Sequence, residues 1–271
     1  MIIRIAILFF LASCLCAPAA AETLTIPGSG SPEYILGELA KTFNIQQKLH
    51  TVVIPPTIGT AGAFREIFEG NATIGRIGRP LKEDERNLGL TFHSLGRDPI
   101  VFVGGAGVTA HGISSAQVLG IYSGQLTNWQ ELGSKSATIR AIGRESTDAS
   151  YSGIARSVKN FDGIKYADAI KVVHLDSQLL ELLDRFPASF GFLNRSALSA
   201  AKTSLALLSL DATEANAENL ASGRYPLWLE IGLIYKKKDL TEAGRSFLEF
   251  VASPSGLQLL RSHGLVSTAP K

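Results

Sequence analysis

Short apolar runs alternate along the chain with segments whose apolar positions recur every three to four residues. Runs of the first kind predict strands, and they lie at residues 23–26, 51–54, 99–103, 139–142 and 231–235. Segments with helical spacing lie at residues 35–43, 63–68, 149–158, 243–251 and 256–260. The run 99–103 is apolar at every position, as expected of a strand buried on both faces. This alternation predicts an α/β architecture.

The first 21 residues have the pattern of an export signal. Arg4 precedes a short apolar core, and small residues follow as far as Ala21. A membrane-spanning helix needs ~20 apolar residues, so this core is too short for an anchor, and no other stretch is long enough. Two outcomes stay open. Residues 19–21 fit cleavage after Ala21, whereas residues 11–14 resemble a bacterial lipobox that would leave a lipid anchor at Cys14. We therefore expect export to the periplasm, with or without a lipid anchor.

The composition excludes several classes of protein and kinds of site. The chain has 271 residues, of which 45% are hydrophobic, and 26 Lys and Arg face 24 Asp and Glu. Such a chain is too apolar for disorder, and too close to neutral to bind nucleic acid through bulk charge. Both cysteines, Cys14 and Cys16, lie in the signal, so the folded part has no Cys nucleophile or Cys-based metal site. No histidine pair has metal-ligand spacing, and no nucleotide fingerprint is complete, so we expect no metal and no cofactor.

One type of loop recurs three times: it follows a predicted strand, is rich in Gly, Ser or Thr, and opens a predicted helix. The candidate ligand-binding residues of these loops are Ser29, Gly30 and Ser31 in the first, Thr60, Ala61 and Gly62 in the second, and Arg144, Asp148, Ala149 and Ser150 in the third. In the first loop, Pro32 is placed at the first helical position.

A helix start carries unpaired N–H groups and a partial positive charge, which suits a small oxyanion. Taken singly, each loop also fits ordinary capping, because Ser31, Thr60 and Asp148 are common N-cap residue types. Three such starts in one chain favour a shared anion site.

With these loops in place, the chain resembles the periplasmic phosphate-binding proteins of ABC importers, within the type II periplasmic-binding fold. Besides the loops, the resemblance rests on residues 79–81 (Arg-Pro-Leu), 118–129, 186–192, 225–227 and 247–256. It implies two α/β lobes joined by two hinge crossings, with a ligand cleft between them. Carried onto this chain, residues 22–99 plus 230–271 form lobe 1, and residues 100–229 form lobe 2. A bound ligand would favour a closed state that a membrane partner recognises.

The third loop departs from the family pattern, in which Arg is followed after three residues by Ser-Gly-Thr. Arg144 keeps the arginine, but Asp148, Ala149 and Ser150 hold the other positions. An ionised Asp148 in the cleft would repel phosphate by ~4 kcal/mol at ~4 Å and an effective dielectric of ~20. Arg144 and Arg79 can both bind an oxyanion, or Arg144 can pair with Asp148 at i, i+4 and Asp148 can cap the helix. These alternatives stay open on the sequence.

The sequence thus favours an exported solute-binding protein, not an enzyme, that captures a small anion, with phosphate the leading candidate. Its expected partner is an ABC permease or a sensor. Two alternatives remain: a degenerate relative with another ligand or a protein partner, and an exported phosphate-ester hydrolase. The presumed site has no base or metal cluster beside a nucleophile, which argues against the hydrolase.

Overall fold

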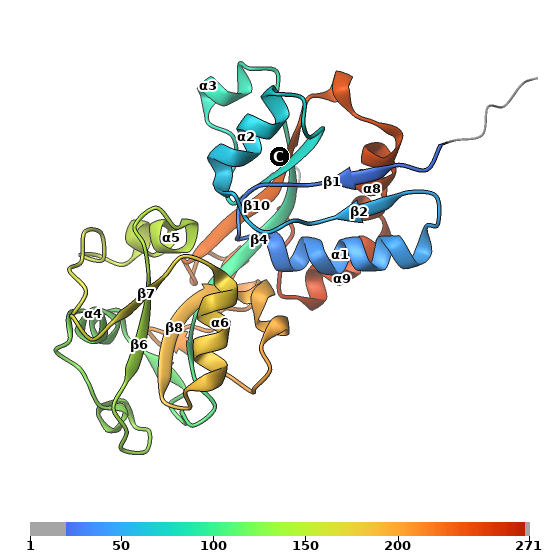
Figure 1. Ribbon diagram of the computed structural model, residues 1–271. Coiled ribbons are helices and arrows are strands. Elements are labelled where there is room, and N and C mark those ends of the chain that lie inside the picture. Colours follow the sequence, from blue (N-terminus) through green and yellow to red (C-terminus); the bar gives the residue numbers. More distant parts are fainter. Residues whose placement is uncertain (1–19, 269–271) are drawn as a thin grey trace, which may run out of the picture.

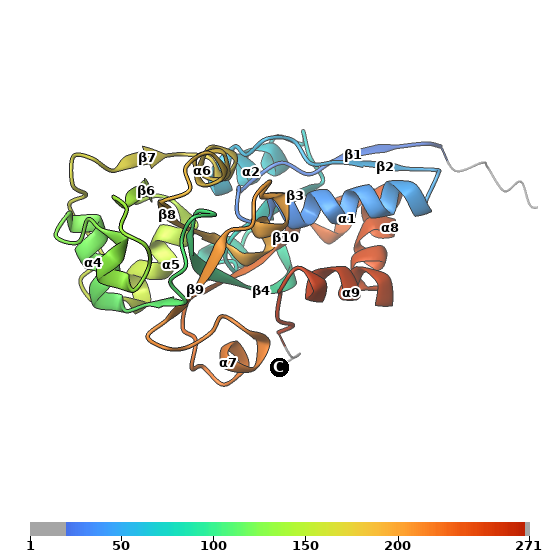
Figure 2. The same cartoon turned by 90° about the horizontal axis from the view of Figure 1, so that it is seen from below.

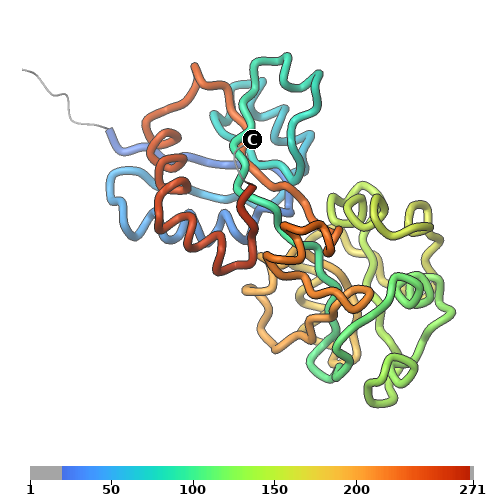
Figure 3. The backbone as a smooth tube through the Cα atoms, turned by 180° about the vertical axis from the view of Figure 1, so that it is seen from behind, coloured from blue at the N-terminus to red at the C-terminus, as the bar shows by residue number. Residues whose placement is uncertain are grey.

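The computed structural model describes residues 20–268 and shows two lobes joined by a pair of long strands (Figures 1 and 3). The predicted α/β class and two-lobed architecture are confirmed. Apart from residues 20 and 21, the predicted export signal lies outside the described residues, and so does Cys14. No helix within residues 20–268 is long and apolar enough to cross a membrane.

The first lobe is built on strands covered by four longer helices and one short one. Its strands are β1 (Thr23–Thr25), β2 (Thr51–Val53) and β3 (Ile74–Ile77), and its helices are α1 (Glu33–Gln46), α2 (Gly59–Phe68), α3 (Glu83–Arg86), α8 (Glu242–Ala252) and α9 (Pro254–Ser262). β1 and β2 pair in parallel, α1 and α8 pack against them, and α9 packs against α1 and α8 (Figure 2). Helical spacing buries one face of α1, where Phe43 meets the Phe247 ring at 5.4 Å.

Strand β3 and the strands of the second lobe belong to one eight-stranded sheet, which is separate from the β1–β2 pair. The elements of the second lobe are β5 (Gly112–Ile113), α4 (Ser115–Ser123), the 3-10 helix η1 (Trp129–Leu132), β6 (Arg140–Arg144), α5 (Ala149–Ser157), β7 (Lys171–Val173), α6 (Asp176–Arg185), β8 (Ser189–Asn194), η2 (Arg195–Ala200), β9 (Ala206–Leu210) and α7 (Ala217–Ala221). β6 pairs in parallel with β7 and β8. The core is aromatic, with the buried rings of Tyr122, Phe161, Phe190 and Phe192 in mutual contact.

The two lobes share β4 (Thr91–Gly104) and β10 (Trp228–Tyr235), which pair antiparallel (Figure 1). The predicted lobe boundaries, at residues 99/100 and 229/230, fall inside these strands. Asp98 of β4 is wholly buried at the crossing, where its carboxylate accepts hydrogen bonds from the amide and hydroxyl of Ser196 in η2. Burial raises the pKa of Asp98 to about 7, although the bonds from Ser196 act to lower it. A titratable group therefore lies within the hinge.

The observed elements extend beyond the predicted ones where the sequence pattern is weak. β4 begins at Thr91, eight residues before the predicted strand. The sequence pattern did not predict this first half because it is only partly buried and carries polar side chains. Pro32 directly precedes α1 instead of occupying its first helical position. Pro254 is the first residue of α9, so this helix begins two residues before the predicted segment 256–260.

Candidate functional site

Four helices begin around one hollow between the lobes. α1 and α2 reach it from lobe 1, and α5 and α6 from lobe 2, enclosing a volume of about 730 Å³. The lining residues are Ser29, Gly30, Ser31, Glu33, Pro56, Thr57, Gly59, Thr60, Ala61, Arg144, Glu145, Thr147, Asp148, Ala149, His174, Leu175, Asp176 and Ser177. We call this volume the helix-start hollow.

Strand direction explains why these helix starts meet. Each of the four helices follows the carboxyl end of a strand, and β1 with β2, and β6 with β7, form parallel pairs. The carboxyl ends of parallel strands share one edge of a sheet, so the loops that leave them gather there. The sequence revealed three of these loops, and the loop between β7 and α6 is the fourth.

Unpaired backbone donors face this hollow from both lobes. Within residues 20–268, the amides of Gly30, Ser31, Thr60, Ala61 and Ala149 have no protein acceptor. The first turn of a helix leaves such amides free, and the helix dipole adds partial positive charge at the same end. The hollow therefore offers donors to an anionic or strongly polar ligand.

Arg144 is held between two carboxylates instead of standing free. Its Nη1 lies 2.5 Å from Asp176 Oδ1, and its Nη2 lies 2.6 Å from Asp148 Oδ2 and 3.2 Å from the His174 carbonyl oxygen. Burial alone would lower the pKa of Arg144, but the two carboxylates outweigh burial and raise it. The trio carries a net charge of about −1. Arg144 Nε is buried without a partner in the described chain and keeps one donor unused.

Asp148 both caps a helix and pairs with Arg144. Its Oδ1 accepts hydrogen bonds from the amides of Ser150 (2.9 Å) and Tyr151 (3.0 Å). The structure thus shows the helix cap and the Arg144 pair together, and Asp148 also lines the helix-start hollow. This carboxylate occupies two of the amide donors at the start of α5, and the Ala149 amide remains available to a ligand.

Arg76 connects the first two loops, although no motif in the sequence marks it as a site residue. The buried guanidinium donates to the carbonyl oxygens of Ser29 (2.8 Å), Ile26 (2.5 Å) and Pro55 (2.7 Å), and it pairs with the Glu33 carboxylate at 3.1 Å. These bonds fix the ends of β1 and β2 relative to each other. A charged residue inside the apolar run of β3 was the available signal.

Not every predicted ligand residue lines the helix-start hollow. Ser29, Gly30, Ser31, Thr60, Ala61, Arg144, Asp148 and Ala149 line it. Gly62 is buried in α2, where a side chain would collide with Ile58. The Ser150 hydroxyl turns away and donates to Asn194 Oδ1 at 2.8 Å.

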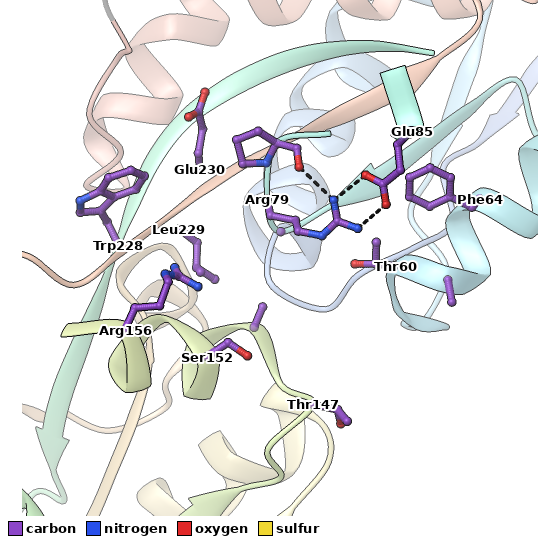
Figure 4. A pocket seen from close by; sticks show the side chains of 14 residues that line it. Thr60, Phe64, Arg79, Glu85, Thr147, Ser152, Arg156, Trp228, Leu229 and Glu230 are labelled. Atoms are coloured by element: carbon purple, nitrogen blue, oxygen red, sulfur yellow. Dashed lines mark hydrogen bonds and ion pairs between the residues drawn. The ribbon is translucent and has the colours of Figure 1, made fainter. Parts of the chain in front are cut away.

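Arg79 lies instead in a second hollow of about 730 Å³ on the side of the hinge strands, which we call the hinge-side hollow (Figure 4). Its guanidinium forms a bidentate salt bridge with the Glu85 carboxylate, with nitrogen to oxygen distances of 2.5 and 2.6 Å. Thr60, Ala61, Thr147 and Ala149 line both hollows, so the two volumes are parts of one interlobe cleft.

No group of three His, Cys, Asp or Glu side chains within residues 20–268 is arranged to hold a metal ion. The Glu145 carboxylate and His174 Nδ1 lie 2.8 Å apart at the mouth of the helix-start hollow, and both side chains are substantially exposed. The arrangement as a whole offers hydrogen-bond donors and paired charges.

Comparisons with known proteins agree with this geometry. A phosphate-binding protein PstS of Borreliella burgdorferi is 22% identical over 90% of both chains, and one of Bacillus subtilis is 24% identical over 86% of this chain and 76% of its own length. A structure of a putative phosphate ABC transporter substrate-binding protein with bound phosphate, from Clostridium perfringens, has a TM-score of 0.75 at 24% identity and covers 91% of this chain and 99% of its own. The model of the PBP superfamily domain matches residues 17–255, and the chain belongs to this superfamily.

Proposed function

We propose that this chain is an exported solute-binding protein that captures phosphate in the interlobe cleft. The observation that carries the proposal is the convergence of unpaired helix-start amides from both lobes on one hollow. A ligand bound by both lobes favours the closed arrangement of the hinge, which gives binding a structural readout. The names of the relatives and the phosphate-bound Clostridium perfringens structure support the choice of ligand.

The charges of the hollow favour a protonated oxyanion. Four carboxylates line it, and each has a cationic or ionisable partner: Glu33 with Arg76, Glu145 with His174, and Asp148 and Asp176 with Arg144. Sulfate has no proton at neutral pH and meets only repulsion from a carboxylate. Hydrogen phosphate carries a hydroxyl that donates to one. We therefore propose that the site selects phosphate over sulfate.

Isothermal titration of the ligand-free protein with phosphate and sulfate tests both statements. We expect saturable phosphate binding, with sulfate at least tenfold weaker. Absence of binding by either ion would contradict the proposal and favour a degenerate relative with another partner, a reading that the capping of α5 by Asp148 supports.

A single-donor variant tests the role of the helix starts. Ala149 is the first residue of α5, where proline fits the helix and removes only an amide that the helix does not use. Loss of one hydrogen bond to a charged ligand costs ~1.5–3 kcal/mol, so Ala149→Pro should weaken phosphate binding at least tenfold. Glu242→Pro makes the same change at the start of α8, outside the cleft, and should leave affinity unchanged.

We further propose that the protein works outside the cytoplasm, delivers its ligand to an ABC permease or reports it to a sensor, and catalyses no reaction. Export would leave either a chain cleaved after Ala21 or a lipid anchor at Cys14. The mass of the mature N-terminus separates these two outcomes. A phosphatase assay with and without divalent metal tests the last point, and turnover abolished by chelation would refute it.

A further inference from the structure

The interlobe cleft is much longer than a phosphate ion. The helix-start hollow and the hinge-side hollow each enclose about 730 Å³ and join along the starts of α2 and α5. Phosphate has five non-hydrogen atoms and needs well under about 100 Å³, given ~30 Å³ for a water molecule in the liquid. Volumes of ~300–1,000 Å³ are typical of sites for organic molecules. Inorganic phosphate would leave most of the cleft filled by water.

The lobes lie close together between the two hollows, so further closure there has little room. Gly78, directly after β3, faces the start of α5, and a methyl group on its Cα would lie 3.4 Å from Ala149 Cβ. The gap between the lobes at this point is therefore about the size of one methyl group. The hinge-side hollow is therefore a feature of the approached lobes and not of a widely open cleft.

The lining of the hinge-side hollow suits the organic part of a ligand. Phe64 of α2 and Trp228 of β10 bring aromatic surface to opposite sides of it, and Leu229 lies next to Trp228 (Figure 4). Arg79 is neutralised by its pair with Glu85. Apolar surface with a few polar groups is the usual composition of a small-molecule pocket.

Two further charges in the hinge-side hollow have no ion-pair partner in the described chain. Arg156 of α5 contributes a cation from lobe 2, and Glu230 of β10 contributes an anion from the hinge. Figure 4 shows the Arg156 guanidinium next to Leu229, and the Glu230 carboxylate on the other side of Leu229, directed away from Arg156. A ligand with a carboxylate and an ammonium or hydroxyl group would match both.

The spacing along α5 fits a small molecule. Arg156 lies seven residues after Ala149, which is ~10 Å along the helix axis. Side chains on a helix lean toward its N-terminus, so the Arg156 guanidinium lies closer to the helix start than its Cα does. A phosphoryl group at the Ala149 amide and a carboxylate at Arg156 are thus separated by the length of a few-carbon chain.

Building on the proposed function, we propose that the ligand is a phosphate monoester of a small hydroxy acid or amino acid, and not inorganic phosphate alone. Its phosphoryl group occupies the helix-start hollow. Its organic part lies against Phe64 and Trp228 in the hinge-side hollow, with its carboxylate on Arg156 and its hydroxyl or ammonium group on Glu230. Binding involves no covalent step.

Isothermal titration with O-phosphoserine, glycerol 3-phosphate and inorganic phosphate tests this assignment. O-Phosphoserine should bind at least tenfold more tightly than inorganic phosphate. Arg156→Gln should weaken O-phosphoserine binding far more than inorganic phosphate binding and so remove that advantage. Arg224→Gln removes an exposed arginine outside the cleft and should change neither affinity. Arg156 and Arg224 are both surface residues, so thermal midpoints should stay near that of the unchanged protein.

The outcomes separate this inference from the proposed function. If inorganic phosphate binds and neither ester binds more tightly, the inference is overturned and phosphate capture stands. If an ester binds tightly but equally well to Arg156→Gln and Glu230→Gln, the placement of its organic part is wrong. If neither the esters nor inorganic phosphate bind, the proposed function and the inference both fall.

Discussion

Removing the Asp148 carboxylate should strengthen sulfate binding far more than phosphate binding. Asp148 and Asp176 together outweigh Arg144, so this trio presents a net charge of about −1 to the helix-start hollow. Asp148→Ser brings the net charge to zero and releases Arg144 Nη2 from one partner. Serine also caps helices well, so the start of α5 should be retained.

The size of the effect follows from the burial of the trio. The side chain of Asp148 is 12% exposed, so solvent screens its charge only in part. One unit charge ~5 Å away contributes ~3 kcal/mol per unit of ligand charge at an effective dielectric of ~20. Sulfate carries two charges, so the contribution is ~6 kcal/mol, which corresponds to about four powers of ten in its affinity before solvent screening is allowed for. Phosphate gains the same relief but loses a carboxylate that accepts its hydroxyl, a bond of ~1.5–3 kcal/mol, so its affinity should change much less.

Isothermal titration of the two proteins with both ions is the assay, and the ratio of phosphate to sulfate affinity is the quantity to compare. Asp184→Ser is the matched control, because Asp184 also accepts backbone amide bonds but lies outside the cleft. Equal sulfate affinity in Asp148→Ser and the unchanged protein would refute the electrostatic reasoning. An unchanged ratio of phosphate to sulfate affinity would show that a group other than Asp148 accepts the hydrogen bond from the phosphate hydroxyl.

Three further predictions concern the frame of the site. Arg76→Met should lower the free energy of unfolding in urea by about 3 kcal/mol, because Glu33 and three carbonyl groups lose a buried partner; adding Glu33→Gln should restore part of the loss. Asp98→Asn should flatten the pH dependence of stability. The folded pKa of about 7 lies above the unfolded ~3.9, so this group's stabilisation is complete below pH ~4 and is lost as pH rises to about 7, by up to ~4 kcal/mol. Equal slopes for both proteins in urea unfolding between pH 4.5 and 7.5 would contradict it. Gly78→Val should hold the lobes apart at Ala149, raise the radius of gyration in small-angle X-ray scattering and weaken phosphate binding at least tenfold.

The sequence predicted those parts of the fold that depend on local periodicity. The helical face of α1 and the continuous apolar run inside β4 were readable because burial imposes a period of 3.6 in one case and an unbroken run in the other. The first half of β4 was not predictable, because its polar and half-buried positions show no clear alternation of apolar and polar residues. The lobe arrangement came from the resemblance to a family and not from periodicity.

Residue types at the site were predictable, but their partners were not. The glycine and hydroxyl-rich loops marked three of the four helix starts, because capping and anion binding both require such residues in the chain locally. That Asp176 would approach Arg144 from another loop, or that Glu85 would occupy Arg79, depends on contacts between segments distant in sequence. A pattern along the chain reports what a residue can do, and only the fold determines which neighbour it meets.

The cleft shows how a nearly neutral chain can recognise an anion. In the arrangement we propose, fixed amides provide the attraction, and the buried carboxylates of Asp148 and Asp176 discriminate against ions that bring no proton. A single arginine facing such a hollow would attract every oxyanion alike, whereas one held between two carboxylates contributes donors without a net positive charge. Selectivity would then reside in the protonation of the ligand. Phosphate affinity should therefore follow the fraction of phosphate that carries a proton, and this dependence distinguishes the arrangement from a purely cationic site.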